Sequence, residues 1–112
     1  MGKYGYSSGS HKSGGNNMNA LMAQAQQMQA QMRDAQEKLA SSEVTGNAAG
    51  GLVEIKMNGS KDVLSVIIKP EAVDPDDVEM LEDLIMAALN DANSQINKLS
   101  DEIMGPFSSL LG

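Results

Sequence analysis

Few residues in this 112-residue chain are of the types that carry out catalysis. The chain has no cysteine, which excludes disulfides, thiolate chemistry and cysteine-based zinc sites. Its only histidine, His11, lies in a stretch rich in Gly and Ser that offers no fixed partner for a catalytic base. Asp76 and Asp77 stand where a helix is expected to begin, and the helix dipole explains them better than a hydrolytic or metal site does. The small residues of 47–51 also lack the spacing of a phosphate-binding glycine loop. The sequence therefore predicts no enzyme, no catalytic residue, no metal, no cofactor and no small-molecule substrate.

The charges are distributed unevenly along the chain, whose formal net charge is −7. Residues 71–112 contain ten acidic residues and one basic residue, Lys98, so this segment carries −9. Residues 1–17 contain Lys3 and Lys12 and no acid. A polyanion is therefore expected to approach the N-terminal part of the chain or the central segment rather than the C-terminal one.

The clearest element signals in the chain predict a helix over residues 75–104. Asp74 is a suitable N-cap, Pro75 fits the first helical position, and Asp77 stands at the reciprocal position of a capping box. Gly105-Pro106 ends the pattern, because proline cannot continue a helix. Such a helix is about 43 Å long at about 1.5 Å per residue, which exceeds what so small a chain needs for its own core.

The apolar residues of this helix indicate a partner. Those at three-four spacing form one face: Val78, Leu81, Ile85, Ala88, Ala92, Leu99 and Ile103. Over residues 80–89 the apolar surface extends around most of the helix, and such a helix must be covered on more than one side. With one Phe and no Trp, the chain can build only a thin core, for which oligomerisation is the usual remedy. We expect a homodimer interface at Met80, Leu81, Leu84, Ile85, Ala88 and Leu89; a thick core within one chain is the alternative.

The N-terminal part of the chain divides at about residue 17. Residues 1–17 have no apolar periodicity and are predicted to be a disordered Gly/Ser-rich tail. A second helix is predicted over 18–41, with Asn17 as its cap. Its apolar residues recur with heptad spacing: Met18, Leu21, Ala25, Met28, Met32, Ala35 and Leu39. The remaining surface of this helix is rich in Gln, and no His or Cys stands near the methionines to make a copper site.

Residues 43–69 are predicted to form about three antiparallel strands. Residues 52–57 alternate in hydropathy, and Asn58-Gly59 is a strong turn signal. Leu64, Val66 and Ile68 are expected on the apolar face, and Val63 and Ile67 on the opposite face. A loop over 58–61 would pair Ile55 with Leu64 and Val53 with Val66, whereas a two-residue turn would keep the same faces, so the register stays open.

Three stretches of the sequence resemble a known family. EVTGNAAGGLVEIKMNG (43–59), DPDDVEMLEDLIMAALNDA (74–92) and QAQQMQ (24–29) are similar to the bacterial YbaB/EbfC nucleoid-associated proteins. The resemblance covers about residues 18–104. It implies an α+β fold in a single domain over 18–112, ordered α-β-β-β-α. It also implies a tweezers-like homodimer whose first helices hold double-stranded DNA with little sequence specificity, in the nucleoid of the cytoplasm, with effects on chromosome organisation and gene expression.

One departure from the family concerns charge. Family members often carry several lysines in the first helix, where this chain has mostly Gln. The candidate DNA-binding residues are therefore Arg33 and Lys38, helped by Lys3 and Lys12. The alternative function is a dimeric protein-interaction module without direct DNA binding. No stretch of about 18 apolar residues occurs, so no membrane partner is expected.

Overall fold

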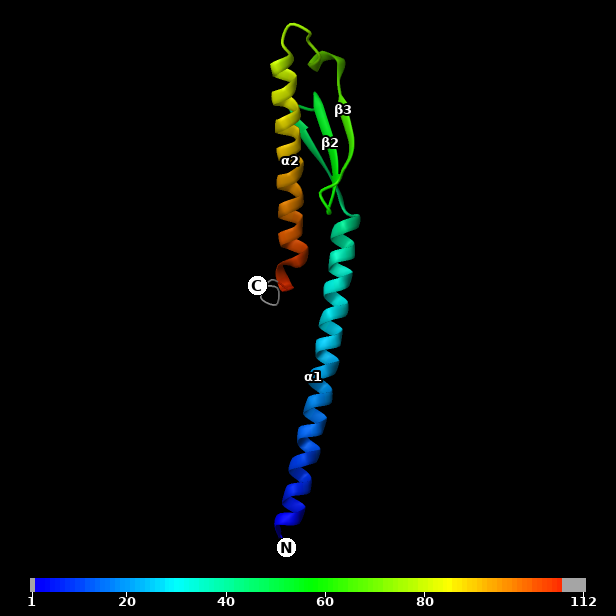
Figure 1. Ribbon diagram of the computed structural model, residues 1–112, viewed down its shortest axis with the longest axis vertical. Helices are drawn as coiled ribbons and strands as arrows, with labels where there is room; N and C mark the ends of the chain where they lie inside the picture. The colour runs from blue at the N-terminus through cyan, green and yellow to red at the C-terminus, as the bar shows by residue number, and fades with distance from the viewer. Residues whose placement is uncertain (1, 108–112) are drawn as a thin grey trace. The chain divides into compact units, whose positions relative to one another are not determined.

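The computed structural model describes the backbone of residues 2–107 and the side chains of residues 17–107. Its elements follow the order α-β-β-β-α, with two short 3₁₀ turns (Figure 1). The chain divides into two compact units, Met1–Asp34 and Ala35–Gly112. The first unit consists of most of helix α1. The second contains the end of α1, a three-stranded sheet and helix α2. The predicted fold class is confirmed.

Helix α1 (Gly2–Ser41) ends where the sequence predicts but begins earlier. Asn17 therefore lies inside the helix and is not its cap. No proline occurs before Pro70, and extending an existing helix avoids the cost of a new nucleus. That residues 1–17 form a disordered tail stays a prediction. At the C-terminal end, the hydroxyls of Ser41 and Ser42 donate to the carbonyl of Lys38, at 3.1 and 2.6 Å, and so occupy a carbonyl that the helix leaves free.

The sheet is an antiparallel meander with the order β1-β2-β3. Its strands are β1 (Glu43–Ala48), β2 (Val53–Asn58) and β3 (Val63–Ile68). Strand β1 extends to Ala48, because the turn that follows it uses only residues 49–52. Ala49, Gly50 and Gly51 all have positive φ there, which two glycines make easy. Along β2, buried residues alternate with more exposed ones, as the hydropathy pattern predicts.

The pairing of β2 with β3 differs from the pairing considered for a 58–61 loop. Val53 lies opposite Ile68, and Ile55 opposite Val66. The faces of Val66 and Ile68 are as predicted, because this register differs from the expected one by two residues. A bulge interrupts the ladder next to Met57, which lies opposite Val63. Val63 is thus on the same face as Met57, which corrects its predicted position; the extra residue of a bulge causes such changes.

Helix α2 (Val78–Met104) begins three residues later than predicted. Its N-cap is Asp77, whose carboxylate accepts from the N–H of Met80 at 3.1 Å. Asp74 instead accepts from the N–H of Asp76 at 2.9 Å and so forms a separate turn before the helix. The capping-box reading fails with it, because the residue three beyond the true cap is Met80. Gly105 caps the other end in a helical conformation, so the stop is due to Pro106, which has no N–H to donate.

The core lies where α2 packs against β1 and β2 (Figure 1). At the centre of this contact stands Gly46 of β1. A Cβ at Gly46 would collide with the Ala88 carbonyl and the Ala92 N–H of α2, so only glycine allows the helix backbone to come this close. The residues buried around this contact are Ala48, Val53, Ile55, Met57, Ala72, Ala88, Ala92 and Ile96. Its small side chains make the core thin, as the composition predicts.

Two side chains of α2 cover the outer edge of β1. The N–H of Asn47 donates to the Asp91 carboxylate at 2.9 Å, and the Gln95 amide donates to the Thr45 carbonyl at 2.8 Å. Gln95 also donates to Asp91 at 3.1 Å. These bonds occupy strand groups that another chain would otherwise pair with. One flank of α2 is thereby fixed over the β1 edge.

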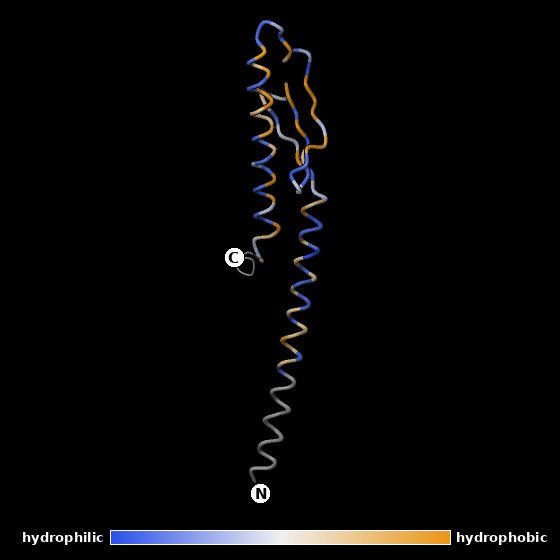
Figure 2. The backbone as a smooth tube through the Cα atoms, viewed as in Figure 1, coloured by the Kyte–Doolittle hydropathy of each residue, from blue (hydrophilic) through white to orange (hydrophobic). Residues whose placement is uncertain are grey.

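Strand β3, at the other edge of the sheet, is not covered by any part of the chain that the structure describes. All six of its residues are exposed, although five of them are Val, Leu or Ile. Figure 2 shows this hydrophobic strand beside the more mixed β1 and β2. Because Asp91 and Gln95 hold one flank of α2 at β1, the opposite flank, with Val78 and Leu89, lies toward the β3 side of the sheet. The uncovered apolar surface therefore includes both a strand and a helix flank.

Candidate nucleic-acid interface

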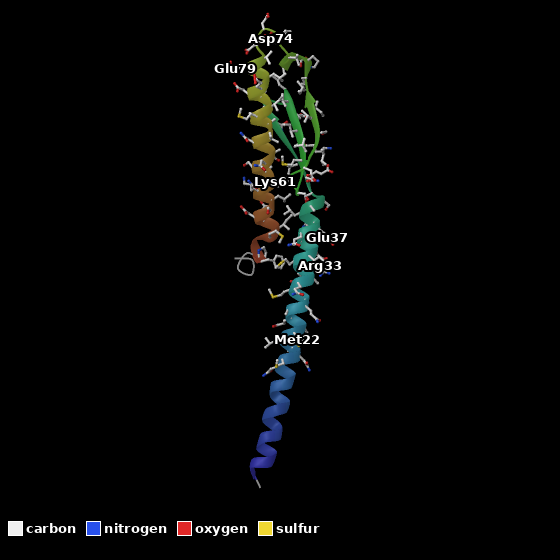
Figure 3. All side chains as sticks on the ribbon, in the orientation of Figure 1. Met22, Arg33, Glu37, Lys61, Asp74 and Glu79 are labelled. Atoms are coloured by element: carbon white, nitrogen blue, oxygen red, sulfur yellow. The ribbon has the colours of Figure 1, made fainter. Side chains whose placement is uncertain are left out.

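Helix α1 carries two of the predicted DNA-binding residues. Arg33 and Lys38 are both exposed, and among the described side chains neither forms an ion pair. They stand five residues apart, about 140° around the helix, so they present positive charge on two sides of it. Their acidic neighbours, Asp34 and Glu37, are also exposed and unpaired in the described region. Figure 3 labels Arg33 and Glu37 on this helix. The side chains of Lys3 and Lys12 lie outside the described residues.

Positive charge is also present where α1 joins the sheet. Lys56, near the end of β2, lies 3.7 Å from Glu43 and is partly neutralised by it. Lys61, in the β2–β3 turn, is exposed and has no ion-pair partner within residues 17–107. The sequence analysis assigned no role to Lys61. Lys61 follows the turn signal Asn58-Gly59, but the sequence does not show that this turn contacts α1.

The opposite end of the sheet is strongly acidic. Seven acids and one lysine, Lys69, lie between residues 69 and 83: Glu71, Asp74, Asp76, Asp77, Glu79, Glu82 and Asp83. Asp74 and Glu79 stand at this end in Figure 3, away from Lys61. Phosphate groups are repelled from such a concentration of carboxylates. The distribution of charge within residues 35–107 therefore favours the end where α1 enters the sheet.

Helix α1 also exposes apolar side chains. Four of the heptad-spaced or neighbouring residues are prominent, with exposed fractions from 40 to 63%: Met18, Leu21, Met22 and Met28 (Met22 is labelled in Figure 3). Exposed Met and Leu side chains at helical spacing are typical of a surface that contacts another helix or protein. The helix thus offers both the charges that DNA needs and the apolar groups that a protein partner needs.

The residues expected at a dimer interface occupy different environments. Ala88 is completely buried against β1 within its own chain, so it is not free to contact a partner. Leu81, Leu84 and Ile85 pack on the chain's own core and are half-buried. Leu89 is the most exposed of the set, at 38%. Strand β3, which the sequence analysis did not include in the interface, is a further exposed apolar surface.

The described residues contain neither a metal cluster nor a membrane span. No group of three or more His, Cys, Asp or Glu side chains is placed to hold a metal among them. None of the helices in the described part is long and apolar enough to cross a bilayer.

Comparison with known proteins identifies the family. A model of the YbaB/EbfC DNA-binding family matches residues 14–111. A nucleoid-associated protein of Mycobacterium sp. (strain KMS) is 54% identical over 95 residues, which cover 85% of this chain and 86% of that protein. A nucleoid-associated protein of Chloroflexus aurantiacus is 51% identical over 92 residues, which cover 82% of this chain and 92% of the relative. The crystal structure of the uncharacterized protein HP0035 from Helicobacter pylori has the same fold, with a TM-score of 0.58 at 22% identity, over 70% of this chain and 92% of that one. The chain belongs to the YbaB/EbfC DNA-binding family.

Proposed function

We propose that this protein binds double-stranded DNA as a homodimer, with little sequence specificity, in the nucleoid of a bacterial cytoplasm. Family membership and the relatives named nucleoid-associated proteins support this assignment. On this proposal the protein acts by binding and has no catalytic activity. Effects on chromosome organisation and gene expression would follow from its occupancy of DNA.

The observation that carries the proposal is the state of Arg33 and Lys38 on α1. A cation can neutralise a phosphate only if it is not already neutralised by a carboxylate, and these two are exposed and unpaired in the described region. Each such contact releases counterions and adds affinity that does not depend on the base sequence. Nothing in the spacing of one Arg and one Lys selects particular bases, so near-neutral recognition is expected.

Dimerisation would double this small number of charges. The uncovered surface of β3 and the adjoining flank of α2 support a second copy as the partner, because a strand that is apolar on both faces is a liability in water. The blocked edge of β1 leaves β3 as the free edge of the sheet. Of the expected interface residues, Leu89 fits this surface best, with Val78 and Met86 as additional exposed apolar residues of α2.

A protein partner is the second candidate function, favoured by the exposed methionines and Leu21 of α1. The two candidates differ in their response to salt. DNA affinity falls steeply as salt is added, because lysine and arginine side chains release counterions from the phosphates, and this release is less favourable at high salt. The affinity of an apolar contact between proteins falls little as salt is added, and some salts strengthen the burial of apolar surface.

Gel-shift titration of random-sequence duplex DNA at two salt concentrations tests the proposal. We expect a shift at low salt that weakens strongly at high salt, with similar affinity for unrelated duplexes. Retention of a protein ligand at both salt concentrations, with no shift of DNA at either, would replace the DNA-binding proposal with the protein-interaction one.

A further inference from the structure

The turn between β2 and β3 is held in one conformation by Asn58. Its side-chain oxygen accepts from the N–H groups of Ser60 and Asp62, at 2.9 and 3.0 Å. Its carbonyl accepts from the N–H of Lys61 at 2.9 Å, and its own N–H donates to the carbonyl of Asp62 at 3.1 Å. Four hydrogen bonds to one residue leave the turn little freedom, so the position of Lys61 is well defined.

The same turn rests on the C-terminal end of α1. The N–H of Gly59 donates to the carbonyl of Ser42 at 3.1 Å. A side chain at Gly59 would overlap the carbonyl of Leu39, so the turn contacts the helix backbone directly. Lys38 precedes Leu39, and Lys61 lies two residues after Gly59, at most about 7.6 Å along the chain. The turn thus brings Lys61 next to the part of α1 that carries Lys38.

The backbone of Lys61 is in an unfavourable conformation. Its φ is +66°, in the left-handed region that glycine and asparagine adopt more readily than lysine. Strain at a non-glycine residue is commonly retained where the side chain has a function. The Lys61 side chain is exposed, and in the described region neither it nor Lys38 has an ion-pair partner, in contrast to Lys56.

We propose that Lys61 and Lys38 form a phosphate-binding site for the DNA backbone at the base of α1. The proposal rests on the function proposed above and adds a contact from the sheet to the contacts from the helix. Two unpaired ammonium groups on backbone segments that contact each other suit one or two neighbouring phosphates, and they impose no preference for particular bases. The adjacent Asp62 reduces the local positive charge, so the site serves contact with phosphate rather than attraction over long distances.

This site would supply a substantial share of the contacts available to the protein. Lys56 is engaged with Glu43, Lys69 lies at the acidic end of the sheet, and α1 otherwise offers Arg33 within residues 17–41. A chain with so few available cations depends on each of them more than a lysine-rich relative would.

Substitution of Lys61 with Asn tests the site. Asn tolerates a positive φ, so Lys61→Asn should fold at least as well as the native chain. Lys69→Gln is the matched control, because it removes the same charge from the opposite end of the sheet. We expect Lys61→Asn and Lys38→Gln each to weaken binding to random duplex DNA several-fold. Each should also lower the slope of log K against log salt by about 0.9 per lost phosphate contact. Lys61→Arg should retain native binding.

The outcomes separate the site from the general function. If Lys61→Asn binds DNA no more weakly than Lys69→Gln while the native protein binds well, the site at the base of α1 is wrong and DNA binding stands. Weak binding by Lys61→Arg as well as Lys61→Asn would assign the loss to the turn rather than to charge, and would also overturn the site. If the native protein does not shift DNA at low salt, the proposed function fails and this site fails with it.

Discussion

Single polar side chains determine where the elements of this protein begin and turn. Asp77 rather than Asp74 caps α2, because its carboxylate reaches the N–H of Met80. Asp74 closes the preceding turn through the N–H of Asp76. Both carboxylates satisfy backbone groups, and neither is part of a metal site in the described region. The presence of acidic residues at these two positions is thereby explained by local structure.

This difference gives the first prediction. Asp77→Ala removes the cap of a 27-residue helix and should lower the free energy of unfolding by about 1 kcal/mol. Asp74→Ala removes only a bond within an exposed turn and should cost less. Urea denaturation of both variants measures the difference. A larger loss for Asp74→Ala than for Asp77→Ala would show that the helix begins at residue 75 instead.

The elements show what periodicity in a sequence can and cannot predict. Alternating hydropathy predicted the faces of β2 correctly, because burial repeats with a period of two. It did not predict the register with β3, since pairings that differ by two residues bury the same faces. The bulge opposite Met57 has no hydropathy signature, and it moved Val63 to the core face.

Close backbone packing was equally invisible in the sequence. Gly46 lies within a β-prone stretch, where the sequence alone indicates only that a glycine weakens the strand. Its role depends on Ala88 and Ala92, more than forty residues later, which come directly against it. Such a contact is a property of two elements together, so local propensity gives no sign of it.

The second prediction concerns this contact. Gly46→Ala should force α2 away from β1 and lower the free energy of unfolding by about 1–3 kcal/mol, as overpacking of a core does. Gly105→Ala is the control, because Gly105 has helical φ and ψ and an added methyl group meets no described atom within 4 Å. That variant should be neutral or slightly more stable. Equal thermal unfolding temperatures for the two variants would contradict this packing of Gly46 against α2.

At the scale of the whole molecule, the single chain has a thin core and an exposed apolar strand. Among the described residues, the core contains no aromatic side chain, and an apolar strand remains exposed at one edge of the sheet. The sequence predicted that a partner is required but located the contact on α2 alone. That interface stays a prediction, but residues such as Ala88 and Leu81, which share the helical stripe, already pack against the chain's own core.

The third prediction uses two neighbouring residues of β3. Val66, 48% exposed, lies on the face that carries the core, and Ile67, 54% exposed, lies on the opposite face across from Glu54. Val66→Lys should weaken the proposed dimer by several kcal/mol, because it places an unpaired charge in the interface. Ile67→Lys should weaken it much less.

Sedimentation at micromolar concentration reports the result. We expect the native chain and Ile67→Lys to sediment as dimers and Val66→Lys to dissociate or unfold. A well-folded monomer of the native chain, or a stable dimer of Val66→Lys, would contradict the assignment of β3 to the interface.

The most direct test of the account is the DNA affinity of a chain in which Arg33 and Lys38 are both replaced by Gln. Because each α1 presents both residues, a dimer of this variant loses up to four phosphate contacts. The account predicts weaker binding to every duplex by a similar factor, and a salt slope smaller by up to about 0.9 for each lost contact. Binding of random duplex DNA as strong as that of the native protein, with an unchanged salt slope, would contradict it.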